Sequence, residues 1–129
     1  MLKVHALVID DNPDNSRVLV QLLNLEGLTC TWLSDTADLV SNLDRLHDVS
    51  VVFLDLELPK TNGYEVLRVI KTHPNFRDVF VIAYTVHTSE INTAYEKGFD
   101  GFVGKPVNAE VFPEHLRRIL NREHVWSWD

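Results

Sequence analysis

The sequence predicts an α/β fold in which a parallel sheet of five strands carries five helices on its two faces. Short apolar runs rich in β-branched residues recur along the chain and stop at polar residues, which is typical of strands buried on both faces. Segments with apolar residues at helical spacing lie between these runs. This alternation predicts βαβ units with right-handed crossovers, and therefore helices on both faces of the sheet.

Three of the expected strands are continuous apolar runs with clear polar ends. The first run stops at an acidic pair, the second at Asp55 and the third at Thr85. Two weaker candidates, each only four or five residues long, complete the set. The five expected strands lie at residues 4–9, 29–33, 51–54, 79–84 and 101–104.

The expected helices are recognised by apolar spacing and by their end signals. Gly27 and Gly98 are placed as C-terminal stops, and Thr88 or Ser89 can cap the fourth helix. Pro113 falls about one turn into the last helix, which predicts an irregular or late start there. The five helices are expected at residues 15–26, 36–46, 63–71, 88 or 89 to 97, and 108–121.

Length and composition predict a single domain. The 129 residues fit one domain over 1–129, with a core at about 4–121 and a short C-terminal tail at 122–129. Cys30 is the single cysteine, so an intrachain disulfide is impossible. We expect a cytoplasmic protein without membrane insertion, because the chain begins without a signal-type leader and its apolar runs are short. The net charge of −7 argues against direct binding to nucleic acid.

Five polar residues follow four of the predicted strands and are expected to meet. Parallel strands bring their carboxyl ends to one edge of a sheet, where open α/β sheets bind ligands. Three clustered carboxylates repel unless a cation lies among them, and Mg²⁺ prefers such oxygen ligands. A carboxylate can also accept a phosphoryl group, whose charge a metal ion, an ammonium and a hydroxyl would stabilise. These residues are Asp10, Asp11, Asp55, Thr85 and Lys105.

Four motifs at these strand ends, taken together, carry a resemblance to a known family. They are VIDDN at 8–12, LDLELP at 54–59 followed by NG at 62–63, IAYT at 82–85 and GFDGFVGKP at 98–106. In this order, the motifs resemble those of response regulator receiver domains over almost the whole chain. The resemblance implies a doubly wound, flavodoxin-like sheet with the strand order 2-1-3-4-5.

The resemblance also implies roles for the residues at the sheet edge. Asp55 is expected to accept the phosphoryl group. Asp11 would bind Mg²⁺ directly, Asp10 largely through water, and Asp55 and the backbone carbonyl of Glu57 would complete the ligands from the protein. Lys105 would pair with the acidic cluster and then with a phosphoryl oxygen.

Two further residues are implied to form the switch of the receiver. Thr85 would move to hydrogen-bond the phosphoryl group, and the rotamer of Phe102, three residues before Lys105, would couple to that movement. Pro106 occupies a position at which the family has a cis peptide bond. An aromatic residue in a short strand is usually part of the core, so the switch role of Phe102 comes from the resemblance alone.

Three positions vary within the family and are expected to modulate the site. Glu57 places a further negative charge two residues beyond Asp55, and His87 lies two residues beyond Thr85; both are expected to influence the lifetime of the phosphoryl group. Val86 is bulkier than the small residue usual at its position, and we expect it to narrow access to the phosphoryl site. The other histidines have no metal-ligand spacing and receive no role: His5, His47, His73, His115 and His124.

These residues lead to the hypothesis of a receiver in a two-component phosphorelay, without an attached output domain. A sensor histidine kinase or a histidine phosphotransfer protein would donate the phosphoryl group. Phosphorylation would switch the face built from the last two expected helices and the last expected strand. An unknown output protein would bind this switched face, with a phosphorylation-linked dimer as one option. The chain would be no enzyme beyond its own phosphorylation and dephosphorylation. Trp126 and Trp128 are interpreted as docking on the domain or contacting a partner.

Three other functions are weighed against this hypothesis. A receiver-shaped scaffold that works without phosphorylation is disfavoured, because the acidic residues, Thr85 and Lys105 are all present. Only Val86 favours this alternative. An aspartyl-phosphate phosphatase of the haloacid dehalogenase type is disfavoured, because Glu57 replaces the second Asp of its Asp-x-Asp signature and no cap domain is present. Flavin binding is disfavoured because the carboxylates would repel a flavin phosphate and the first loop lacks the glycines that cradle one.

Overall fold

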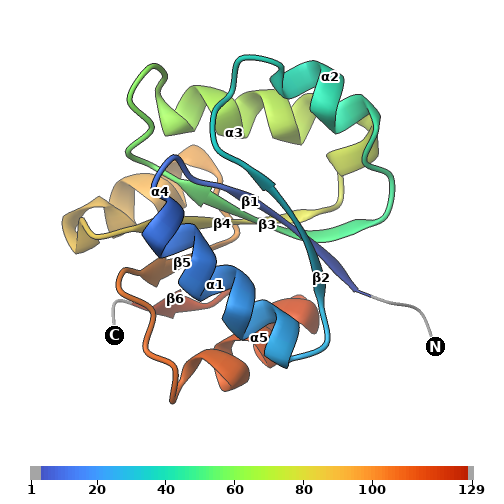
Figure 1. Cartoon of the computed structure of the whole chain (residues 1–129). Coiled ribbons are helices and arrows are strands. Elements are labelled where there is room, and N and C mark those ends of the chain that lie inside the picture. The colour runs from blue at the N-terminus through green and yellow to red at the C-terminus, as the bar shows by residue number, and fades with distance from the viewer. Residues whose placement is uncertain (1–3, 128–129) are drawn as a thin grey trace.

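The apolar runs form the strands of one parallel sheet, with the longest runs at its centre (Figure 1). The structure is a computed structural model that describes residues 4–127. The strand order is β2-β1-β3-β4-β5-β6, and all five pairings are parallel. The strands are β1 (His5–Ile9), β2 (Thr29–Leu33), β3 (Val49–Asp55), β4 (Phe80–Thr85), β5 (Gly101–Gly104) and β6 (Trp126–Ser127). The expected α/β class and the order of the first five strands are confirmed.

Five α-helices within residues 4–127 connect the strands, and their ends follow the local end signals. The side chain of Asn12 accepts hydrogen bonds from the first turn of α1, and Pro13 lies in that turn, so α1 begins two residues earlier than expected. Pro113 lies in the first turn of α5, and the late start of that helix is confirmed. The helices are α1 (Pro13–Leu25), α2 (Leu39–Asp44), α3 (Gly63–Thr72), α4 (Ile91–Lys97) and α5 (Phe112–Leu120), with short 3₁₀ turns η1 (Pro74–Phe76) and η2 (Thr88–Glu90).

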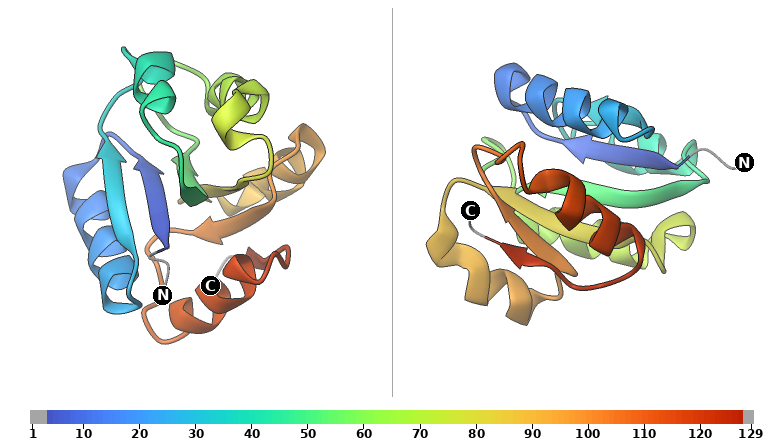
Figure 2. Two further views of the ribbon diagram at one scale, coloured as in Figure 1. Left: turned by 90° about the vertical axis from the view of Figure 1, so that its right-hand side faces the viewer. Right: turned by 90° about the horizontal axis from the view of Figure 1, so that it is seen from below.

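Two apolar cores cover the two faces of the sheet. One core packs α2, α3 and α4 against side chains such as Leu7 and Ile9 of β1. The other core lies on the face that carries α1 and α5 (Figure 2). It packs these helices against the alternate residues Ala6 and Val8 of the same strand. Among residues 4–127, no helix is long and apolar enough to cross a membrane.

A sixth strand corrects the expectation of five strands followed by a tail. β6 pairs with β5, and the backbone N–H of Phe102 donates to the carbonyl of Val125 at 2.7 Å. Val125 is buried in the core under α5, and the Trp126 ring meets Tyr95 of α4 edge-on with 5.4 Å between centroids. Gly101 permits this approach, because a Cβ there would lie 2.7 Å from the Val125 carbonyl oxygen. Trp126 therefore docks on the domain, whereas Trp128 lies outside the described residues.

Candidate functional site

The ends of four strands deliver the predicted polar residues to one edge of the sheet. Asp10 and Asp11 directly follow β1, and Asp55 is the last residue of β3. Thr85 is the last residue of β4, and Lys105 directly follows β5. Because the strands are parallel, these residues from distant parts of the chain all lie at the carboxyl end of the sheet.

The three carboxylates form a compact cluster with one ammonium partner. Ligand oxygens of Asp10, Asp11 and Asp55 all lie within 4.8 Å of one another, with Asp10 and Asp55 buried and Asp11 exposed. The Nζ of Lys105 lies 3.1 Å from Asp10 Oδ2 and 3.4 Å from Asp55 Oδ1, and its side chain is only 4% exposed. One ammonium leaves two of the three negative charges uncompensated. The donor set and its charge therefore fit a divalent cation with oxygen ligands, as Mg²⁺ requires.

The environment of Asp55 opposes its negative charge when no metal ion is bound. Burial raises the pKa of Asp55 to about 6, and the neighbouring charge of Asp10 adds to the increase. The Lys105 ammonium and the backbone N–H of Glu57, which donates to Asp55 Oδ1 at 2.9 Å, act in the opposite direction. A cation bound beside Asp55 would remove this conflict by stabilising the carboxylate form.

Tyr84 is a contributor to the site that the sequence reasoning missed. The Lys105 ammonium lies over its ring, with 4.6 Å from Nζ to the ring centroid, so a cation–π contact and two ion pairs together hold the lysine. Burial and the charges of Asp10 and Asp55 raise the pKa of the Tyr84 hydroxyl. Its position directly before Thr85 in a buried strand is the only sequence signal that points to it.

Glu57, Thr85 and His87 form a second polar group beside the acidic cluster. The hydroxyl of Thr85 donates to the Glu57 carboxylate, and the backbone N–H of His87 donates to the Thr85 oxygen at 3.1 Å. The Nε2 atom of His87 lies 3.4 Å from Glu57 Oε2. Thr85 is fully buried at this position, while Val86 is 49% exposed. The hydroxyl proton of Thr85 is thus directed at Glu57 in this state.

Phe102 is completely buried in the core that packs α3 and α4 against the sheet. Its backbone lies between β4, where it pairs with Ala83, and β6, where it pairs with Trp126. The Lys105–Pro106 peptide bond is cis, as the sequence reasoning expected. The segment from Phe102 to Pro106 therefore joins the acidic cluster to the core and to the last strand.

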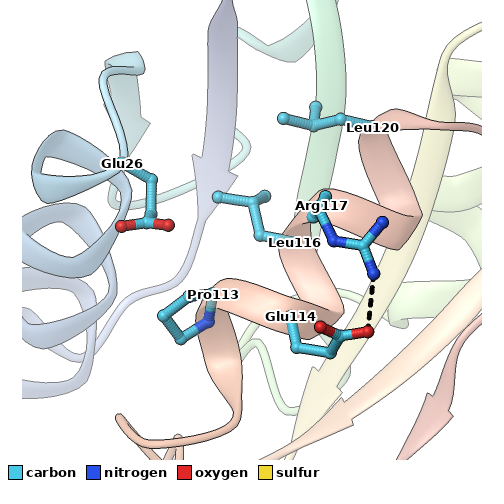
Figure 3. A pocket seen from close by; sticks show the side chains of 6 residues that line it. All are labelled: Glu26, Pro113, Glu114, Leu116, Arg117 and Leu120. Carbon is cyan, nitrogen blue, oxygen red and sulfur yellow. Dashed lines mark hydrogen bonds and ion pairs between the residues drawn. The ribbon is translucent and has the colours of Figure 1, made fainter.

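A separate pocket lies between the C-terminal end of α1 and helix α5 (Figure 3). Its volume is about 460 Å³, and none of its lining residues belongs to the acidic cluster. Glu114 and Arg117 form an ion pair of 2.6 Å along one wall. The lining residues are Glu26, Pro113, Glu114, Leu116, Arg117 and Leu120.

The geometry agrees with a comparison of the sequence with known protein families. A sequence model of the response regulator receiver domain matches residues 6–117 of the chain. The chain belongs to the response regulator receiver domain family. The matched range contains the acidic pair, Asp55, Thr85 and Lys105, so the receiver assignment includes the complete candidate site.

Curated relatives place this receiver among two-component signalling proteins. It is 32% identical over 124 residues to the transcriptional regulatory protein CpxR of Klebsiella pneumoniae, covering 94% of the chain and 50% of CpxR. It is 28% identical over 116 residues to the sensor histidine kinase RcsC of Escherichia coli, covering 90% of the chain and 12% of RcsC. The receiver thus spans half or less of the length of these two relatives.

Solved receiver structures have the same fold. The receiver domain of a sensor histidine kinase from Pseudomonas aeruginosa, solved with a magnesium ion coordinated in its active site cleft, matches with a TM-score of 0.77 and 27% identity, covering 94% of this chain and 97% of that one. A chemotaxis response regulator of Vibrio cholerae matches with a TM-score of 0.81 over 92% of this chain and 99% of that one. Its 18% identity supports the fold alone.

Proposed function

We propose that Asp55 is the phosphoryl acceptor of this receiver, and that Asp10, Asp11, Asp55 and the backbone carbonyl of Glu57 hold the Mg²⁺ ion that the reaction requires. The observation that carries the proposal is the meeting of three carboxylates and Lys105 at the carboxyl end of the sheet. When bound, Mg²⁺ supplies positive charge that stabilises the carboxylate of Asp55 and the phosphoryl oxygens.

The residues of the chain have defined tasks in the transfer. A carboxylate oxygen of Asp55 forms a bond to phosphorus while the phosphorus–nitrogen bond of a donor phosphohistidine breaks. The donor imidazole leaves with the bonding electron pair and takes up a proton. Lys105, already 3.4 Å from Asp55, can turn from the carboxylates to a phosphoryl oxygen and compensate its charge.

Thr85 and Phe102 are proposed to convert this event into a conformational change. The phosphoryl oxygens offer the Thr85 hydroxyl an acceptor that competes with the Glu57 carboxylate it now contacts. Movement of Thr85 at the end of β4 would open space for the Phe102 ring, which belongs to the neighbouring strand. Phosphorylation would thereby shift the population between two conformations of the face formed by α4, β5 and α5.

Glu57, Val86 and His87 are proposed to set the lifetime of the phosphoryl group. The Glu57 carboxylate adds negative charge beside the phosphoryl site and holds the Thr85 hydroxyl before transfer. His87 approaches the same carboxylate and thereby positions it. Val86 directly follows Thr85, and its branched side chain is proposed to restrict the approach of water to the phosphoryl group.

The phosphoryl donor is proposed to be a phosphohistidine of a sensor kinase or of a phosphotransfer protein. The response regulator and kinase relatives support this class of donor. Output would come from protein–protein binding by the switched face, including self-association, and the chain would act on no separate substrate.

Beryllofluoride, which mimics a phosphoryl group on a carboxylate, tests the proposal directly. We expect a bound fluorine signal by ¹⁹F NMR that requires both Mg²⁺ and Asp55 and is absent in Asp55→Asn. The same titration, followed in ¹H–¹⁵N spectra, should shift the amides of Thr85 and Phe102. Metal binding without any beryllofluoride complex would favour a scaffold that works without phosphorylation.

A further inference from the structure

Trp32 links the edge strand β2 to the loop that carries the acidic pair. Its indole Nε1–H donates a hydrogen bond to the backbone carbonyl of Asp10, with 2.7 Å between nitrogen and oxygen. The ring is 43% exposed and lies outside both apolar cores. With Pro13, Arg17 and Val20 of α1 it lines a groove of about 260 Å³ between that helix and β2. A large, half-exposed aromatic residue thus directs its single polar hydrogen at the site loop.

The carbonyl that Trp32 contacts belongs to the peptide bond between Asp10 and Asp11. This peptide unit is planar, so fixing the carbonyl oxygen also fixes the direction in which the Asp11 backbone leaves. The N–H of Asp10 is held by the carbonyl of Leu33 at 3.1 Å, and Asp10 Oδ1 accepts the N–H of Asn12 at 2.9 Å. The indole completes this arrangement at the one peptide plane that separates the two acidic residues.

Among residues 4–127, no other side chain holds this carbonyl as closely. The Ser16 hydroxyl lies 3.5 Å from the Asp10 carbonyl oxygen but only 2.8 Å from that of Asn12, so its short hydrogen bond is directed elsewhere. The indole N–H is a donor without acceptor capacity, so it cannot exchange its role with a neighbour. Trp32 thus donates the shorter of the two side-chain hydrogen bonds that the structure gives this carbonyl.

We propose that Trp32 is a positioning residue for the metal site, acting through the Asp10–Asp11 peptide. The indole holds the exposed Asp11 carboxylate so that it faces the buried carboxylates of Asp10 and Asp55. This inference rests on the proposed Mg²⁺ site. It adds a residue of β2, which contributes no ligand, to the group that determines metal affinity. Mutating a residue that orients a metal ligand from outside the coordination sphere commonly weakens metal affinity by about 10–100-fold.

Trp32→Phe tests the proposal, because it removes the N–H and keeps an aromatic ring in the groove. We expect Mg²⁺ to bind about tenfold more weakly, measured from backbone amide shifts in an NMR titration. The phosphorylation rate should return to the wild-type value at saturating Mg²⁺, because the residue acts through metal binding and not on the phosphoryl group. Trp126→Phe is the matched control and should bind Mg²⁺ as the wild type does.

The wild-type protein provides a second test that does not depend on folding of the variant. Once Trp126→Phe and Trp128→Phe have assigned the other two indole signals, the remaining ¹H–¹⁵N indole peak is that of Trp32. We expect this peak to be slow in solvent exchange and to shift during Mg²⁺ addition with the midpoint of metal binding.

The outcomes separate the inference from the proposed function. An unresponsive Trp32 indole peak, or an unchanged Mg²⁺ affinity in Trp32→Phe, would overturn the inference while leaving the metal site intact. Failure of the wild-type protein to bind Mg²⁺ would overturn the proposed metal site itself and the inference with it.

Discussion

Replacing Asp55 with Asn should stabilise the metal-free protein, although it removes the proposed phosphoryl acceptor. The folded protein raises the pKa of Asp55 from an ordinary value of 3.8 to about 6, chiefly through burial. Each tenfold change in proton affinity is worth about 1.4 kcal/mol, so the ionised carboxylate costs about 3 kcal/mol of folding free energy at neutral pH. Asn carries no charge, and its side-chain oxygen can still accept the N–H of Glu57.

The assay is urea unfolding of both proteins in EDTA at several pH values. Between pH 3.8 and about 6 the folded wild type binds more protons than the unfolded chain, so the Asp55 contribution to stability falls as pH rises through this window. The free energy of unfolding of Asp55→Asn should therefore exceed that of the wild type by about 3 kcal/mol at pH 7.5. The difference should disappear near pH 4, because the Asp55 carboxyl group of the folded protein is then protonated and as uncharged as Asn. All other groups titrate in both proteins, so their contributions cancel in the comparison.

A matched control separates burial from a general effect of removing charge. Asp38 is exposed, and its side chain makes no capping hydrogen bond at α2, so Asp38→Asn should change stability by less than about 0.5 kcal/mol. Saturating Mg²⁺ should reduce the advantage of Asp55→Asn, because the ion binds more tightly to, and so stabilises more, the protein that retains the Asp55 carboxylate. Equal or lower stability of metal-free Asp55→Asn at pH 7.5 would refute the electrostatic reasoning.

Three further substitutions test separate parts of the molecule. With Mg²⁺ present, Lys105→Ala should fold, as judged by circular dichroism, yet lose the amide shifts caused by beryllofluoride; loss of folding would mark the lysine as structural. Glu57→Ala retains the backbone carbonyl but frees the Thr85 hydroxyl from the Glu57 carboxylate. Beryllofluoride should therefore bind roughly threefold to tenfold more tightly in NMR titrations. Unchanged affinity would show that Glu57 does not control the switch. Val125→Ala should lower the free energy of unfolding by about 2 kcal/mol in urea, since this side chain is buried; a neutral result would mean that the residue leading into β6 adds little to the core.

The acidic cluster could be predicted because chain direction determines it. Once three apolar runs indicate parallel strands, the residues after each run must gather at one edge, and no knowledge of side-chain torsions is needed. Asp10, Asp55 and Lys105 therefore meet as expected, with Lys105 in contact with both carboxylates. The cis bond before Pro106 was expected from the resemblance and is present.

The sixth strand could not be predicted, because a segment of two residues has no recognisable period. Whether residues 126–127 pair with β5 depends on tertiary contacts, namely the burial of Val125 and the room left by Gly101. Trp126 was expected either to dock or to contact a partner, and its contact with Tyr95 shows docking. The physical reason is that the free edge of β5 offers unpaired backbone groups to the nearest chain segment.

The side-chain hydrogen bonds of Glu57 and Trp32 at the site could not be predicted from the sequence either. Glu57 was expected to modulate the phosphoryl group through its charge, but its contact with the Thr85 hydroxyl depends on rotamers and on the spacing of two loops. Trp32 gave no signal at all, because its hydrogen bond to Asp10 joins residues 22 positions apart through a backbone carbonyl. Such contacts follow from the assembled fold rather than from local pattern.

Intact-mass spectrometry after incubation with a small phosphodonor tests most directly whether Asp55 is a Mg²⁺-dependent phosphoryl acceptor. We predict that the wild-type protein gains the mass of one phosphoryl group in Mg²⁺ and none in EDTA, and that Asp55→Asn gains none in either. Folded wild-type protein that demonstrably binds Mg²⁺ and yet gains no mass would contradict the proposal, as would equal phosphorylation of Asp55→Asn.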